Sequence, residues 1–256
     1  MPTDTNLAVV ILAAGQGKRM QDPTKPKVLY ELADKPLVGH VLDLAKRLGA
    51  GRIITIVGFG REKVISYIND SYKGVEFAIQ SEQLGTGHAV RQTQGLLDFY
   101  SGDVLILYGD VPLTSEATLK SMLATHYKSG AKATVLSTMI DNPTGYGRIV
   151  RSSDGKHLEK IVEEKDADDQ IRRIREINSG ICIIDSEELF RALTEVTPNN
   201  SQKEYYLTDV FTILIARHGK QAVALEVAPD PIEVTGVNTK EQLQELETEY
   251  FTRQKN

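Results

Sequence analysis

The sequence predicts an α/β protein with a mostly parallel central sheet, covered on both faces, and a smaller second lobe. In the first half, continuous apolar runs alternate with segments of helical spacing, the pattern of parallel strands buried between helices. A glycine-rich loop directly follows the first apolar run. After about residue 130 the alternation gives way to closely spaced strands.

The elements of the first half follow one another in a regular order. Apolar, β-branched runs predict strands at Leu7–Leu12, Arg52–Val57, Val75–Gln80 and Asp103–Tyr108. Apolar residues at helical spacing predict helices at Pro36–Leu48, near Arg61–Ile68, at Gly87–Leu97 and at Ser115–Lys128. Gly49 ends the first of these helices.

The second half is predicted as a mixed lobe built onto the first. Strands are expected at Ala133–Met139, Gly145–Arg151 (a loop entering a strand), Lys156–Glu163, Ile177–Ile184 and Ala222–Glu226. Helices are expected at Ser186–Thr194, Thr208–His218 and from Lys240 to the C-terminus. The charged run Asp166–Arg173 is expected to be solvated surface. No linker rich in Gly, Ser or Pro interrupts the chain, so residues 1–256 are predicted as one domain with lobes at about 5–130 and 131–240 and a C-terminal helix at 241–256.

Composition excludes several classes of protein. The chain has 256 residues, 41% of them hydrophobic and 25% charged, which is too apolar for a disordered chain. A net charge of −5 argues against general nucleic-acid binding, although a local basic pocket for a phosphorylated small molecule stays open. Cys182 is the single cysteine, which favours a reducing compartment and excludes an intrachain disulfide.

Several sequence signals are missing from the chain. It contains neither CxxC nor HExxH, the common zinc signatures. It has no apolar run of membrane-spanning length, and its start, Met1–Asn6, is short and polar, unlike a signal peptide. We therefore expect a cytoplasmic protein without membrane partners.

The glycine-rich segment Leu12–Met20 (LAAGQGKRM) predicts an anion-binding loop. Its glycines let backbone N–H groups approach an anion, and Lys18 and Arg19 add positive charge. The dinucleotide fingerprint fails because Met20 stands where a third glycine is required. The P-loop pattern fails because Gly17-Lys18 is followed by arginine. Taken alone, the segment is also compatible with a purely structural turn.

The glycine-rich loop is accompanied by further motifs. LAAGxGxRM followed by Pro26–Leu29 (PKVL) is similar to the signature of sugar-1-phosphate nucleotidyltransferases. Seven later motifs occur in order: Gln80–Ala89, Tyr108–Leu113, Pro143–Arg148, Ile161–Asp166, Glu176–Ile181, Glu204–Asp209 and Glu233–Asn238. Together they resemble the uridylyltransferase domain of bacterial bifunctional N-acetylglucosamine-1-phosphate uridyltransferases, over roughly residues 7 to 250.

The resemblance implies a fold, a reaction and a metal. It implies a Rossmann-like three-layer nucleotidyltransferase fold, with a nucleotide-binding first lobe and a sugar-binding second lobe. The implied reaction joins UTP and N-acetylglucosamine 1-phosphate into UDP-N-acetylglucosamine, a cell-wall precursor, and pyrophosphate, by in-line attack with Mg²⁺ as cofactor. The acetylating β-helix that forms the other half of such proteins has no counterpart here. We therefore expect no acetyltransferase activity, no trimer of the kind which that half would build, and a monomer or weak dimer.

The resemblance also assigns residues to the two substrates. Arg19 and Lys27 are expected to be the catalytic cations, because two phosphorylated substrates bring heavy negative charge. Asp110 and Asn238 are the expected Mg²⁺ ligands. UTP is expected at Leu12, Ala13, Ala14, Gly15, Gln80, Gly85, Thr86 and Asp110. The sugar is expected at Tyr108, Gly147, Glu163, Asn178, Tyr205 and Thr208.

Several other polar residues are expected to have no part in catalysis or substrate binding. Lys18 and Lys25 are expected at the surface or behind the site. His88 lies at a helix start without an implied carboxylate partner, so general-base catalysis by it is disfavoured. Cys182 lies in an apolar strand and is expected in the core.

The sequence departs from the family pattern at two places. The run Met20–Pro26 is one residue longer than expected, which bears on how far Lys27 reaches. Glu164 stands where a neutral or basic residue is common, and we expect it to alter sugar affinity.

Three alternatives stay open at this point. One is the same chemistry with glucose 1-phosphate or another sugar 1-phosphate and UTP or dTTP, since few contacts separate sugars. A second is a non-catalytic nucleotide-sugar sensor, which would not need Arg19, Lys27, Asp110 and Asn238 together. A third is an NAD-dependent oxidoreductase, which the missing third glycine disfavours.

Overall fold

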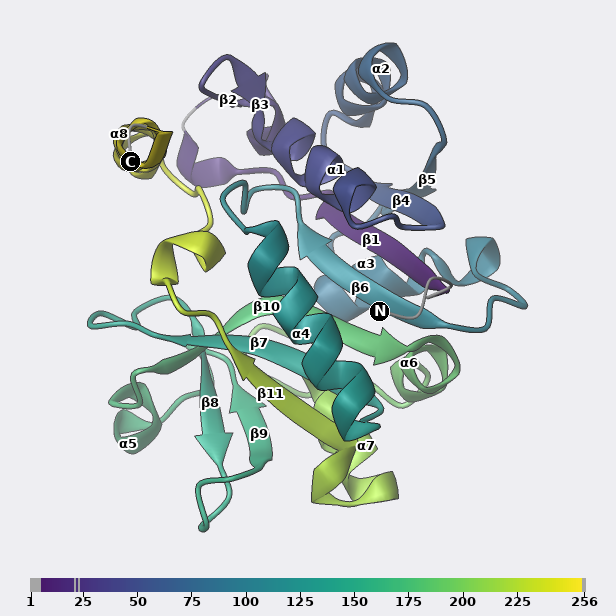
Figure 1. Cartoon of the computed structure of the whole chain (residues 1–256), viewed down its shortest axis with the longest axis vertical. Helices are drawn as coiled ribbons and strands as arrows, with labels where there is room; N and C mark the ends of the chain where they lie inside the picture. The colour runs from purple at the N-terminus through teal and green to yellow at the C-terminus, as the bar shows by residue number, and fades with distance from the viewer. Residues whose placement is uncertain (1–5, 21, 23, 255–256) are drawn as a thin grey trace.

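The structure, a computed structural model, describes residues 6–20, 22 and 24–254. Over these residues the mixed α/β class and the mostly parallel central sheet are confirmed. The main sheet has nine strands among the described residues, ordered β11-β7-β10-β6-β1-β4-β5, with β8 paired to β10 and β9 paired to β8 (Figure 1). The polar start of the chain and residues 255–256 of the predicted C-terminal helix lie outside the described residues.

The strands match the predicted runs closely. The sheet consists of β1 (Leu7–Ala13), β4 (Arg52–Val57), β5 (Val75–Ile79), β6 (Asp103–Tyr108), β7 (Ala133–Met139), β8 (Gly147–Arg151), β9 (Leu158–Val162), β10 (Glu176–Asp185) and β11 (Val223–Val227). A two-stranded hairpin, β2 (Glu31–Leu32) and β3 (Lys35–Pro36), was not predicted. Its turn residues Ala33 and Asp34 have φ of 49° and 60°, without a glycine to signal the turn.

The helices agree with the sequence except in two places. They are α1 (Leu37–Arg47), α2 (Arg61–Ser71), α3 (Thr86–Arg91), α4 (Glu116–Ser129), α5 (Asp169–Arg172), α6 (Ser186–Leu193), α7 (Asp209–His218) and α8 (Lys240–Gln254). The predicted helix Gly87–Leu97 is too long, since α3 ends at Arg91 and a 3-10 turn covers Gln94–Leu96. The run predicted as plain surface contains α5, which Asp168 caps through its side chain.

The sheet is the middle layer of three. Alternate residues of β1 enter different cores: Ala8 and Val10 pack with α3, α6 and α7, whereas Val9 and Ile11 pack with α1, α2 and α4. This double burial explains why the strand has an unbroken apolar sequence. A third cluster under α8 contains Met20, which directly follows Arg19.

The sheet direction changes at β10. Strands β6, β1, β4 and β5 are mutually parallel, whereas β10 runs antiparallel to both β6 and β7. The start of β10 therefore lies at the edge where the parallel strands end. The chain also reverses its direction of travel across the sheet between β1 and β6, and in open α/β sheets ligands bind at such a switch point.

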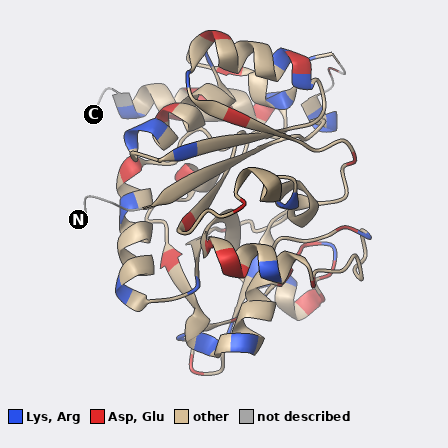
Figure 2. Ribbon diagram, turned by 90° about the vertical axis from the view of Figure 1, so that its right-hand side faces the viewer, with Lys and Arg blue, Asp and Glu red and all other residues tan. Residues whose placement is uncertain are grey.

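Charged residues are interspersed over the molecule. Lys and Arg alternate with Asp and Glu across both lobes in the view of Figure 2. Within the part of the chain that the structure describes, no helix combines the length and apolar character needed to cross a membrane.

Candidate active site

Two adjoining cavities open where β1, β5 and β6 end and β10 begins. The first measures about 300 Å³ and the second about 230 Å³. Thr86, Tyr108 and Glu204 line both cavities. The two cavities therefore adjoin, an arrangement that suits a reaction between two substrates.

The first cavity brings together residues from five separate segments of the chain. Every residue predicted for the nucleotide lines it: Leu12, Ala13, Ala14, Gly15, Gln80, Gly85, Thr86 and Asp110. Gln83, which also lines the cavity, fixes the glycine-rich loop: its Nε2 donates to the Ala14 carbonyl at 2.8 Å. Gln83 was not predicted, although it lies inside the QSEQLGTGHA motif.

Gln80 is oriented by its neighbours. Its side chain is buried, and its Nε2 contacts the Gly85 carbonyl and His88 Nδ1, each at 3.2 Å. His88 in turn contacts Gln92. His88 is thus a partner of Gln80 within the protein, in keeping with the expectation that it is no general base.

The turn around Gly85 lies tightly against the second lobe. Gly85 has φ of +105°, and a Cβ there would lie 2.6 Å from the Tyr205 carbonyl oxygen. Only glycine permits this approach. The Thr86 hydroxyl accepts a hydrogen bond from the Leu207 N–H at 3.2 Å, which joins the two lobes beside the cavities.

Two positively charged side chains and two side chains with acceptor oxygens lie together beside the first cavity. Lys27 Nζ forms an ion pair with Asp110 Oδ2 and lies 3.1 Å from Asn238 Oδ1. Arg19 Nη2 donates to the same Asn238 oxygen at 2.8 Å. The side chains of Lys27 and Asp110 are only 15% and 14% exposed, so their charges are weakly screened.

The longer loop before Lys27 does not prevent this approach. Gln21 and Pro23 of the loop lie outside the described residues, and Asp22 accepts hydrogen bonds from the backbone and hydroxyl of Thr24. Lys27 reaches Asp110 from a short 3-10 turn, Lys27–Leu29. The sequence analysis named Lys27, Asp110 and Asn238 as site residues, but it did not predict the direct contacts of Lys27 with the other two.

The oxygen donors suit a hard divalent cation. Carboxylate and amide oxygens are the ligand types that Mg²⁺ takes from proteins, and Mg²⁺ is commonly held by one or two protein ligands together with waters and phosphates. Asp110 and Asn238 fit that description. Among residues 6–20, 22 and 24–254, no group of three or more His, Cys, Asp or Glu forms a metal cage of its own.

The second cavity collects most of the residues predicted for the sugar. Tyr108, Gly147, Glu163, Asn178 and Thr208 all line it. The Thr208 hydroxyl donates to Glu163 Oε1 at 3.0 Å, and Asn178 Oδ1 accepts from the Gly180 N–H at 3.0 Å.

Burial raises the pKa of two titratable groups of this cavity. Burial, with nearby Asp166 and Asp209 adding repulsion, raises the pKa of Glu163 above its ordinary value, while the Thr208 hydrogen bond opposes this shift. Burial also raises the pKa of Tyr108, so that its phenol stays protonated.

Tyr205 is not where the sequence suggested. Its ring lies beside that of His88 at 6.3 Å, with the Arg91 guanidinium 5.5 Å from its centre, and Tyr206 lines the second cavity instead. Tyr205 therefore does not line the second cavity and Tyr206 does, because the two neighbouring side chains point in different directions. Glu204 was also missed, although it stands in the same EYYLTD motif.

Lys18, Lys25 and Cys182, which were expected to have no role in the site, do not line either cavity. Lys18 is exposed, and Lys25 Nζ lies 4.9 Å from the centre of the Tyr30 ring. Cys182 is buried in the core, and burial raises the pKa of its thiol.

This fold, with paired cavities and converging cations at the sheet edge, defines a nucleotidyltransferase-type α/β protein. Residues 9–179 match the family model described as "MobA-like NTP transferase domain". The chain belongs to this family of nucleotidyltransferases, and the predicted enzyme class is thereby confirmed.

Relatives and solved structures agree with the family. The chain is 48% identical over 238 residues to the "Bifunctional protein GlmU" of Geobacillus thermodenitrificans, covering 93% of this chain and 50% of that protein. It is 44% identical to the protein of that name from Geobacter metallireducens, covering 98% and 51%. The chain thus spans about half the length of these curated relatives.

The fold is shared with more distant proteins. A putative glucose-1-phosphate thymidylyltransferase from Bacillus anthracis superposes with a TM-score of 0.76 at 17% identity, covering 94% of each chain. An apo UDP-glucose pyrophosphorylase superposes with a TM-score of 0.77 at 17% identity, covering 96% of this chain and 98% of that one. At such identity the similarity establishes the fold.

Proposed function

We propose that the chain transfers UMP from UTP to N-acetylglucosamine 1-phosphate, giving UDP-N-acetylglucosamine and pyrophosphate. The observation that carries the proposal is the pair of adjoining cavities with Lys27, Arg19, Asp110 and Asn238 beside one of them. The motifs shared with the uridylyltransferase domain, and the identity of 44–48% to proteins named GlmU, support this choice of nucleotide and sugar.

The reaction needs positioning and charge neutralisation more than proton transfer. A phosphate oxygen of the sugar phosphate attacks the α-phosphorus of UTP, and the bond from that phosphorus to the bridging oxygen breaks as pyrophosphate leaves. No covalent bond to the protein forms. Charge on the phosphoryl oxygens must be offset as the in-line transition state forms.

Lys27 and Arg19 supply the converging positive charge. Both side chains contact Asp110 or Asn238. When substrate binds, the two cations can exchange these oxygens for phosphate oxygens. The guanidinium of Arg19 suits bidentate binding of the triphosphate. Lys27, at the cavity wall, suits the α-phosphate and the sugar phosphate.

Asp110 and Asn238 would hold Mg²⁺ as the cofactor. When bound, the ion would offset phosphate charge and help orient the phosphates. The residues of the chain itself keep the nucleotide in place: Gln80 presents an amide to the uracil edge, and the loop Leu12–Gly15 presents backbone groups.

The second cavity would bind the N-acetylglucosamine. The Gly147 N–H, the Glu163 carboxylate and the Asn178 amide are suited to its hydroxyl and acetamido groups, and Tyr108 and Thr208 complete the wall. The proposal includes a cytoplasmic setting, supported by the single buried cysteine, and a monomer or weak dimer.

Pyrophosphate release tests the proposal. The protein is mixed with UTP and Mg²⁺ and with N-acetylglucosamine 1-phosphate, glucose 1-phosphate or glucosamine 1-phosphate, with EDTA as a control. We expect fast, metal-dependent release with the N-acetyl sugar. Release with glucose 1-phosphate instead would keep the chemistry and overturn the sugar assignment. Binding of nucleotide without release from any sugar would favour a sensor.

A further inference from the structure

An ion pair between a buried arginine and a partly exposed glutamate lies next to the second cavity. Arg148 is 1% exposed, and its Nη2 donates to Glu164 Oε2 at 2.7 Å. Arg148 belongs to β8, opposite Val162 of β9, and Glu164 lies two residues after the end of β9. Neither residue lines the cavity. Glu164 is one of the two places at which the sequence departs from the family pattern.

Both members of this pair bind the loop that does line the cavity. Glu164 Oε2 also accepts the Gly145 N–H at 3.3 Å, and an Arg148 guanidinium nitrogen donates to the Tyr146 carbonyl. Two consecutive residues of the loop are therefore tied to one ion pair. Gly145 has φ of +89°, so its backbone is held in a conformation that few residues adopt.

The next residue, Gly147, begins β8 and lies between two groups suited to the sugar. A Cβ at Gly147 would lie 3.4 Å from Glu163 Oε2 and 3.6 Å from Asn178 Cβ. A small rotation of the Gly145–Gly147 backbone would therefore change the distance between the Gly147 N–H and whatever occupies that gap.

Stability alone gives a poor explanation for the pair. Arg148 Nε is buried with no hydrogen-bond partner among the described residues, and a buried ion pair with an unsatisfied N–H is seldom better than apolar packing. Hydrogen bonds from Arg148 and from the Gly145 amide outweigh the effect of burial and keep the pKa of Glu164 below its ordinary value, so the pair stays charged at neutral pH.

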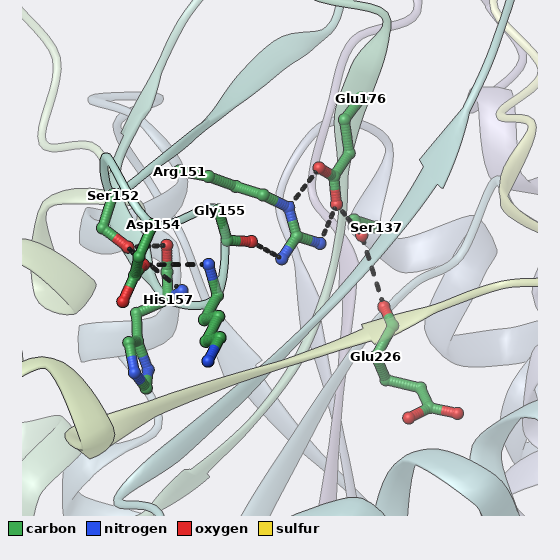
Figure 3. A network of polar contacts seen from close by, with 9 residues as sticks. Ser137, Arg151, Ser152, Asp154, Gly155, His157, Glu176 and Glu226 are labelled. Carbon is green, nitrogen blue, oxygen red and sulfur yellow. Dashed lines mark hydrogen bonds and ion pairs between the residues drawn. The ribbon is translucent and has the colours of Figure 1, made fainter.

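The other end of β8 provides a contrast. Arg151 donates twice to Glu176 at 2.6 Å and also to the Gly155 carbonyl, and Ser137 donates to Glu176 as well (Figure 3). This second ion pair also fixes β8, but Arg151 and Glu176 do not line either cavity. It serves as the matched control.

We propose that Arg148 and Glu164 are positioning residues that fix the Gly145–Gly147 loop for recognition of the sugar 1-phosphate. This role rests on the proposed function. It acts through the loop, without contact between the pair and the substrate. Loosening the pair should therefore weaken the sugar substrate selectively and leave the nucleotide unaffected.

Steady-state kinetics of two Glu164 variants test this role. Glu164→Ala removes the oxygen that accepts hydrogen bonds from the Gly145 N–H and from Arg148. It should raise the KM for the sugar phosphate about tenfold, which is equivalent to losing roughly one hydrogen bond. The KM for UTP should stay within about twofold of the wild-type value. Glu164→Gln keeps an acceptor oxygen, stays closer to the wild-type fold and should give a smaller increase.

Two controls separate this role from general destabilisation. Glu176→Gln weakens the ion pair at the far end of β8, and Glu159→Gln removes an exposed charge from β9. Neither should change the KM for the sugar phosphate. Hydrogen–deuterium exchange of the peptide spanning the loop, measured without substrate, should speed up in Glu164→Ala and not in Glu159→Gln.

The outcomes distinguish the two proposals. An unchanged sugar KM in Glu164→Ala, an equal rise in both KM values, or the same rise in Glu176→Gln would each overturn the positioning role. Absence of turnover in the wild-type protein with every sugar 1-phosphate would instead refute the proposed function, and this role with it.

Discussion

If the proposed function is correct, Lys27 lies where Asp110 and Asn238 would hold the divalent cation. Its ammonium group contacts both Asp110 and Asn238, the two oxygen donors suited to the metal. The Lys27 ammonium group thus offsets the charge of Asp110 within the protein. Metal and nucleotide should therefore bind together, because the phosphates draw Lys27 away from Asp110 while the metal replaces it.

Replacing Lys27 with Met should separate these two effects. Turnover should fall by about 10²–10³-fold, as for loss of one charged group at a transition state. Binding of Mn²⁺ without nucleotide, followed by electron paramagnetic resonance, should strengthen because Asp110 loses its competing partner. Lys25→Met, beside the Tyr30 ring, is the control that should change neither quantity. Near-normal turnover in Lys27→Met would remove Lys27 from the reaction.

Glu163 should lower stability at neutral pH. Its pKa is raised in the folded state, chiefly by burial, so the folded protein binds more protons than the unfolded chain between the two pKa values. Its contribution favours folding below the unfolded pKa and is lost as the pH rises through the folded pKa. The ionised Glu163 carboxylate thus lowers the free energy of unfolding, and its role would be to bind the sugar.

Glu163→Gln should accordingly be more stable than the wild type at pH 8 while losing sugar affinity. The gain in unfolding free energy should shrink as the pH falls below 4.5, the ordinary glutamate value, where both states become protonated. Urea unfolding at several pH values measures the difference. A stability gain that is independent of pH would contradict the assignment to Glu163 ionisation.

At the level of elements, α8 packs against residues adjacent in sequence to Arg19 and Asn238. Leu246 of α8 packs with Met20 and Val237 in one buried cluster. Met20 directly follows Arg19, and Val237 directly precedes Asn238. The helix therefore holds both ends of the Arg19–Asn238 hydrogen bond through apolar contacts.

Leu246→Ala should therefore affect stability and activity together. Leu246 is 2% exposed, so the truncation should cost about 2–5 kcal/mol in unfolding free energy. It should also lower turnover in protein that is still folded. Leu193→Ala, in the core beneath α6, is the matched control and should cost stability with unchanged turnover. Equal activity losses in both variants would show that α8 has no special connection to the site.

Elements with strong apolar patterning were predictable, and those set by turn chemistry were not. The run Asp103–Tyr108 predicted β6 to the residue, because both of its faces are buried. The β2–β3 hairpin was not predicted because its turn residues, Ala33 and Asp34, adopt a left-handed conformation although neither is glycine. Helix α3 stops early, and the Thr93 hydroxyl there bonds back to the Val90 carbonyl.

At the scale of the whole molecule, the sequence motifs identified candidate site residues, whereas the fold determines which of them lie together. Gln80, Asp110 and Gly15 follow parallel strands, so their meeting at one sheet edge was predictable. The antiparallel direction of β10 was not, and it is what brings Asn178 to the same edge. The choice of Tyr206 over Tyr205 depended on side-chain direction, which no short motif encodes.

The two lobes share one hydrogen-bonded sheet. β10 pairs with β6 of the first lobe and with β7 and β8 of the second. Its residues Cys182 and Ile184 lie in the same core as Val10 of β1 and Phe211 of α7. Neither lobe could unfold without exposing the face of β10 that the other covers.

We therefore expect the lobes to unfold together. Differential scanning calorimetry should give one transition, with a calorimetric enthalpy equal to the van't Hoff enthalpy, although the chain is long enough for two domains. A ligand that fills only the first cavity, such as UTP with Mg²⁺, should raise the midpoint of that single transition without splitting it. Two separate transitions, or a shift confined to part of the heat absorption, would show that β10 does not couple the lobes, and that each lobe folds around its own core.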